Sequence, residues 1–181
     1  MGTIRPSGFF LRSETDRVLS LSMAFSTLLI LARIVYTGQF DFLFLLWNLF
    51  LAWLPYAFTS WAYYHPKWTM GKRFIILFIC WLLFIPNSFY IITDLFHLGA
   101  YYSVPLWFDL VLILSFAWNG LLLGLLSVRQ MEKMMQRYLP GRHELLFIYP
   151  IMWLNALGVY IGRYLRFNSW DVITSPFGLI M

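Results

Sequence analysis

Long apolar stretches alternate with short polar segments along the whole chain. A bilayer core about 30 Å thick is crossed by about 20 helical residues, so an apolar stretch of that length predicts a membrane-spanning helix. Five stretches meet this criterion, over residues 18–36, 42–64, 74–96, 106–128 and 145–165. The pattern therefore predicts an all-α membrane protein, a bundle of about five transmembrane helices that forms a single domain over residues 1–181.

The composition supports the same class of protein. Of the 181 residues, 61% are hydrophobic and only 12% are charged, against roughly 45–50% apolar residues in an ordinary soluble domain. Too few polar side chains are present to cover a soluble core, so the excess apolar surface must face the lipid bilayer. The net charge of +5 comes from short basic clusters between apolar stretches, which argues against a nucleic-acid partner.

The distribution of Lys and Arg predicts the orientation of the chain. Ten of the 13 basic residues lie in the N-terminal segment and in the second and fourth loops: Arg5, Arg12, Arg17, Lys67, Lys72, Arg73, Arg129, Lys133, Arg137 and Arg142. The other three, Arg33, Arg163 and Arg166, lie near helix ends from which they can reach the opposite interface. Because cytoplasmic loops are enriched in Lys and Arg, we expect a cytoplasmic N-terminus and, after five spans, an extracytoplasmic chain end.

Polar side chains gather at the predicted extracytoplasmic ends of three helices. The third helix contributes residues spaced three, four and three apart, which share one helical face: Asn87, Tyr90, Asp94 and His97. Asp109 lies at the start of the fourth helix. The fifth helix ends with two arginines, an amide and a carboxylate: Arg163, Arg166, Asn168 and Asp171. We expect these three helix ends to form one polar site.

Asp94, His97 and Asp109 are the candidate catalytic residues of this site. A carboxylate three residues before a histidine on a helix can orient the imidazole, which then serves as a general acid or base. The alternative is that Asp94 pairs with Arg163 or Arg166, which neutralises a charge that is costly inside a membrane. With one histidine and no cysteine on this side, and with arginines that repel cations, we expect no metal site.

The candidate ligand-binding residues are the remaining polar ones: Asn87, Tyr90, Arg163, Arg166, Asn168 and Asp171. Guanidinium groups bind phosphate and carboxylate groups in a bidentate manner, so the expected ligand is an anionic lipid or a lipid-linked phosphate. The alternative is a non-catalytic accessory or scaffold protein in which the same charges form a structural ion-pair network. The residues identify no cofactor, and they leave open whether the protein is an enzyme.

Small and amide residues within the apolar stretches point to helix packing. Gly120-x-x-x-Gly124 and Gly158-x-x-x-Gly162 match the pattern that allows two helices to approach closely, a pattern also compatible with self-association. Asn48, Asn119 and Asn155 lie near the middle of predicted helices, where we expect hydrogen bonds between helices.

Three motifs carry most of the polar site: Pro86-Asn87-x-x-Tyr90-x-x-Thr93-Asp94-Leu95-x-His97-Leu98, Trp107-Phe108-Asp109, and Gly162-Arg163-x-x-Arg166-x-Asn168-Ser169-Trp170-Asp171. Together they resemble the DUF1361 family of bacterial membrane proteins, over most of the chain from the second helix onward. The resemblance implies a multi-helix bundle in the bacterial cytoplasmic (inner) membrane and carries over no established activity. Members usually continue past the last motif into a further hydrophobic helix, so we expect a shortened member or a truncated reading frame.

Overall fold

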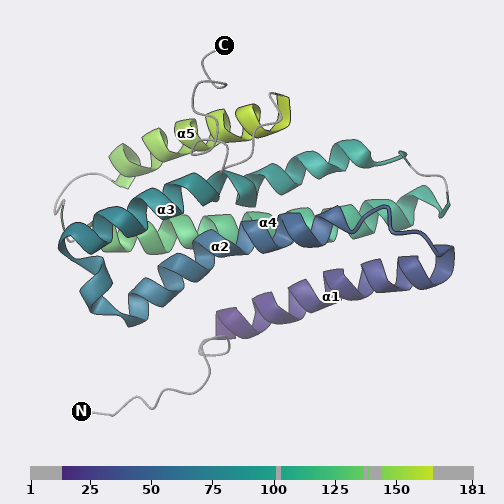
Figure 1. Ribbon diagram of the computed structural model, residues 1–181, viewed down its shortest axis with the longest axis horizontal. Helices are drawn as coiled ribbons and strands as arrows, with labels where there is room; N and C mark the ends of the chain where they lie inside the picture. The colour runs from purple at the N-terminus through teal and green to yellow at the C-terminus, as the bar shows by residue number, and fades with distance from the viewer. Residues whose placement is uncertain (1–13, 101–102, 137, 139–143, 165–181) are drawn as a thin grey trace.

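The computed structural model describes residues 14–100, 103–136, 138 and 144–164, where every regular element is a helix. The elements are α1 (Glu14–Thr37), α2 (Phe44–Tyr64), α3 (Gly71–Tyr90), α4 (Leu106–Met135) and α5 (Glu144–Tyr164), with the 3₁₀ helices η1 (Pro66–Thr69) and η2 (Ile91–His97) on either side of α3. Consecutive α-helices run in alternating directions (Figure 1), and α2 packs closely against both α3 and α4. This is the predicted all-α bundle.

The helices α1 and α5 lie at opposite edges of the bundle, with α2, α3 and α4 between them (Figure 1). The α1 helix packs mainly on α4, and α5 packs mainly on α3. We call the end where α1 begins and α4 finishes the basic end, because it carries Lys67, Lys72, Arg73, Arg129 and Lys133. The other end, where α1 leads into α2 and η2 leads into α4, is the opposite end.

Three helical segments of the described residues are long and apolar enough to cross a membrane: α1, α3 together with η2, and α4. Their apolar side chains include many that are exposed, such as Leu21, Leu28 and Val35 on α1. An exposed apolar helix face of this kind suits a lipid solvent rather than water. The protein is therefore an all-α membrane protein, while membrane crossing by the shorter α2 and α5 stays a prediction.

Close helix approach occurs where glycines face the α3–η2 segment. Although Pro86 lies inside α3, the α-helix continues to Tyr90, and the chain then forms the 3₁₀ helix η2. A Cβ atom added at Gly158 of α5 would lie 2.6 Å from Pro86 Cγ, and one added at Gly120 of α4 would lie 2.8 Å from the Ser88 carbonyl oxygen. These two glycines therefore let α5 and α4 approach α3 more closely than any larger residue would allow.

Amide side chains join helices inside the bundle, as predicted for Asn48 and Asn119. The Asn119 Nδ2 atom of α4 donates to Ser26 Oγ of α1 at 2.9 Å and to the Ser22 carbonyl oxygen at 3.3 Å. The Asn48 amide of α2 donates to Asp94 of η2 at 2.7 Å. Because lipid tails are as apolar as leucine, such polar contacts specify which helices pair.

Candidate functional site

Arg33 is the buried charge at the centre of the opposite end. Ser26, Ile30 and Arg33 belong to the buried face of α1, so the helical period directs the arginine toward α4. Its side chain is only 1% exposed. The Nε atom donates to Asp109 Oδ1 at 2.9 Å, and Nη1 donates to Asp41 Oδ2 at 3.3 Å.

Two further contacts complete the surroundings of Arg33. Its Nη2 atom lies 3.4 Å from Ser103 Oγ, and its Cζ atom lies 4.5 Å from the centroid of the Phe42 ring. Asp109 lies in the first turn of α4, where the helix dipole also favours a negative charge. One guanidinium group thus joins α1, the α1–α2 connection and the start of α4.

The prediction that Arg33 reaches the membrane interface is wrong. The side chain is buried because Asp109 and Asp41 offer counter-charges inside the protein, so the guanidinium needs no contact with water. The same finding gives Asp109, a candidate catalytic residue, a buried ion-pair partner in Arg33. Removing Arg33 would leave Asp109 as an uncompensated buried charge, and removing Asp109 would leave Arg33 with the more exposed Asp41.

Asp94 is buried as well, but its partner is an amide rather than a cation. The side chain is 1% exposed and lies against α2, where Asn48 Nδ2 donates to Asp94 Oδ2 at 2.7 Å. Within the described residues no ion pair joins Asp94 to Arg163, so that part of the predicted pairing does not form. The predicted pairing with Arg166 lies outside the described residues.

His97 lies one 3₁₀ turn after Asp94 and packs against the Phe44 ring, with ring centroids 5.0 Å apart. Its Nδ1 atom lies 3.3 Å from the backbone carbonyl oxygen of Asp94. The contact is therefore with the backbone. The predicted arrangement, in which the Asp94 carboxylate orients the imidazole, is not formed.

Asn87 and Tyr90 are half-buried at the end of α3. The Asn87 amide donates to the Phe84 carbonyl oxygen at 3.1 Å, and the Tyr90 carbonyl oxygen accepts from Thr93 Oγ1 at 2.7 Å. After Tyr90 the backbone has about three residues per turn rather than 3.6. The four polar residues of this segment therefore do not continue along one face of an α-helix.

Arg163 is a partly exposed cation near the opposite end. It lies in the last turn of α5, and its Cζ atom is 5.4 Å from the centroid of the Phe96 ring, which is itself 76% exposed. In the part of the chain that the structure describes, Arg163 forms no ion pair. The remaining candidates of the fifth helix, Arg166, Asn168 and Asp171, lie outside the described residues.

The described side chains divide the predicted site into two parts. Asp94 and Asp109 are buried within the bundle, whereas the Arg163 guanidinium lies on an exposed aromatic ring. Among the described residues, no three His, Cys, Asp or Glu side chains come together as a metal site requires.

Comparison with known protein families assigns the chain to one family. A family model described as "Protein of unknown function (DUF1361)" matches residues 47–181, more than half of the chain. The chain belongs to the DUF1361 family. The DUF1361 match includes Asp94, Asp109 and Arg163, whereas Arg33 and Asp41 precede it. No curated protein and no solved structure matches the chain.

Sequence reasoning missed the roles of Arg33 and Asp41. One signal in the sequence was available: Arg33 lies near the end of the apolar helix α1, whereas the acids of that helix lie only in its first turn. Such a charge requires a partner inside the protein unless it reaches the interface. The partner could not be named because it depends on the packing of α1 against α4.

Proposed function

We propose that this DUF1361 protein binds an anionic head group, that of an anionic lipid or a lipid-linked phosphate, through Arg163 at the opposite end. The proposal includes a multi-pass arrangement in the bacterial cytoplasmic membrane, with a cytoplasmic N-terminus and the opposite end extracytoplasmic. The basic residues of the basic end support this orientation.

One observation carries the proposal: two acids that could neutralise Arg163, Asp94 and Asp109, have other partners among the described residues. Asp109 pairs with Arg33 at 2.9 Å, and Asp94 accepts from Asn48 at 2.7 Å. The Arg163 guanidinium meanwhile lies on the Phe96 ring and forms no ion pair with a described residue. A cation that forms no ion pair with a described residue can attract an anion from its surroundings.

The Phe96 ring suits the arginine to this role. A guanidinium stacked on an aromatic face is held by cation–π attraction, and its edge N–H groups stay available for a bidentate phosphate. Asp94 and Asp109 lie too deep to contact such a ligand, and we assign them structural rather than catalytic roles.

Native mass spectrometry of the protein purified in a mild detergent tests the proposal. Wild type should retain an anionic phospholipid or a polyprenyl phosphate, and the two differ in mass. The Arg163→Ala variant should retain about tenfold less, because one charge-assisted hydrogen-bonding group is lost. The matched control is Arg73→Ala, which removes an exposed arginine whose Cζ lies 5.9 Å from the Trp68 ring at the basic end. Equal retention in all three proteins would contradict the proposal.

A second candidate, a non-catalytic accessory or scaffold protein, is favoured by the closed Arg33–Asp109 pair. Both side chains are 1% exposed, so their charges serve the fold and not a ligand. On this alternative, the wild-type protein retains no specific lipid, and Arg163→Ala changes neither the amount of bound lipid nor the free energy of unfolding.

A further inference from the structure

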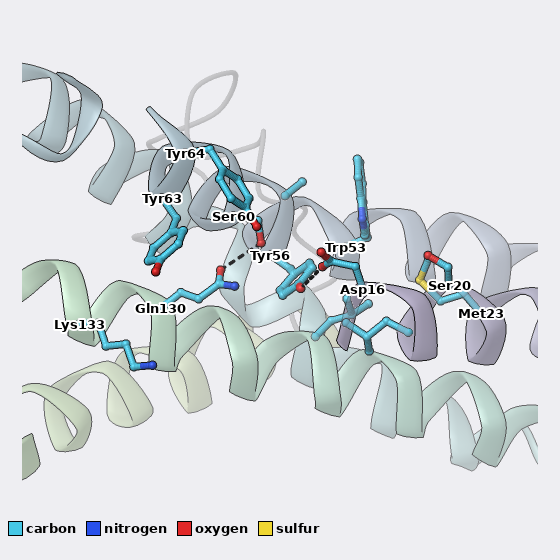
Figure 2. A pocket seen from close by; sticks show the side chains of 13 residues that line it. Asp16, Ser20, Met23, Trp53, Tyr56, Ser60, Tyr63, Tyr64, Gln130 and Lys133 are labelled. Atoms are coloured by element: carbon cyan, nitrogen blue, oxygen red, sulfur yellow. Dashed lines mark hydrogen bonds between the residues drawn. The ribbon is translucent and has the colours of Figure 1, made fainter. Parts of the chain in front are cut away.

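A polar cavity of about 240 Å³ lies at the basic end, between α1, α2 and α4 (Figure 2). Its lining includes a carboxylate, an amide and an ammonium group: Asp16, Gln130 and Lys133. The Asp16 Oδ1 atom accepts from the Tyr56 hydroxyl at 2.5 Å. The Gln130 Oε1 atom accepts from the hydroxyl of Ser60 at 3.1 Å, which leaves the amide NH₂ as the donor of that side chain.

An apolar cavity of about 350 Å³ continues this space along the seam between α1 and α2. The two cavities share Ser20, Met23 and Trp53 as lining residues. The rest of the second cavity is mainly apolar, including Ala24 and Leu49. The two cavities therefore form one open groove along α1 and α2 that is polar at the basic end and apolar toward the middle of the bundle.

The two charges of the groove lie at different depths. Asp16 pairs with Tyr56, two helical turns before the end of α2, and lies near the shared residues that lead into the apolar part. Lys133 lies in the last turn of α4 and lines the cavity together with Tyr63 and Tyr64, the final residues of α2. The carboxylate is thus the inner charge and the ammonium the outer one.

We propose that this groove binds a lipid whose head group is uncharged and rich in hydroxyls, such as a glycosyl group. The acyl chain lies against the apolar seam of α1 and α2. Head-group hydroxyls donate to the Asp16 carboxylate, whose two oxygens can each accept more than one hydrogen bond, and they accept from the Gln130 amide and from Lys133. One positive and one negative lining charge cancel, so a neutral head group leaves no net charge uncompensated.

The depth order of the charges disfavours glycerophospholipids. Their phosphate lies next to the glycerol, so with the chain in the apolar seam the phosphate would approach Asp16, a like charge. An ethanolamine or choline group would then extend toward Lys133, again a like charge. A hydroxyl-rich head group meets neither repulsion, because hydroxyls both donate and accept.

Native mass spectrometry in nanodiscs tests the groove with defined probes. The full chain is placed in a phosphatidylcholine bilayer that holds equal small amounts of glucosyl diacylglycerol, phosphatidylethanolamine and phosphatidylglycerol with the same acyl chains. Wild type should retain the glucosyl lipid in preference to the two others. Asp16→Asn should lower that retention about tenfold, because the charged acceptor is lost, whereas Glu14→Gln, a change of a 91% exposed acid on the same helical turn, should not.

A second pair of variants tests the apolar part of the groove. Ala24→Phe places an aromatic ring in the apolar cavity between α1 and α2. Because Ala24 is exposed, the bundle should still fold, while retention of the glucosyl lipid should fall at least as much as in Asp16→Asn. Leu28→Phe, one turn further along α1 and 61% exposed, is the matched control. Preference for a phospholipid, absence of retained lipid, or retention unchanged by Asp16→Asn and Ala24→Phe would each overturn the proposal. The Arg163→Ala variant should leave retention of the glucosyl lipid unchanged. The proposed lipid site in the groove and the proposed anion site at Arg163 are therefore tested independently.

Discussion

At the residue scale, the two acids that share Arg33 differ in exposure, 1% for Asp109 and 24% for Asp41. A buried ion pair costs more to break than one in contact with solvent, because the remaining charge is left without water. Asp109→Asn should therefore lower the free energy of unfolding by about 3 kcal/mol, and Asp41→Asn by about 1 kcal/mol or less. Denaturant unfolding of both variants in one detergent measures the difference. Equal losses of unfolding free energy would mean that Arg33 depends no more on Asp109 than on Asp41.

At the element scale, α4 meets α3 and η2 through Gly120 and Gly124. A Cβ atom at Gly120 would overlap the Ile91 side chain and lie 2.8 Å from a backbone oxygen, whereas at Gly124 the nearest atom, at 2.9 Å, belongs to the Phe89 ring, which can turn. Gly120→Ala should therefore destabilise the protein by about 2 kcal/mol, and Gly124→Ala by clearly less. The same unfolding assay compares them. Similar small losses would rule out the close backbone contact.

The positions of the helices could be predicted from the sequence, but their partners could not. Bilayer thickness sets helix length, so apolar stretches located all five helices. The α4 helix continues to Met135, past the predicted end at residue 128, because a polar helical turn outside the apolar stretch carries no hydropathy signal. The Arg33–Asp109 pair requires α1 to pack on α4, and nothing in a one-dimensional pattern orders the helices of a bundle.

At the scale of the whole molecule, the basic end and the opposite end should face different compartments. The basic end carries Lys67 in η1 and Lys72 and Arg73 in the first turn of α3, and positively charged segments between membrane spans are retained in the cytoplasm. A reporter fused after Gly99 should therefore read extracytoplasmic, and one fused after Met135 should read cytoplasmic. The reverse result would invert the orientation and place Arg163 at the cytoplasmic face.

On our proposal, Arg33 stabilises the fold whereas Arg163 binds a ligand. The most direct test compares Arg33→Met and Arg163→Met in one preparation, measuring the unfolding free energy and the retained anionic lipid together. We expect Arg33→Met to lose about 3 kcal/mol of stability while its folded fraction keeps the lipid, and Arg163→Met to lose the lipid with little change in stability. The opposite pattern, or a loss of stability alone in both variants, would rule out this division of roles between the two arginines.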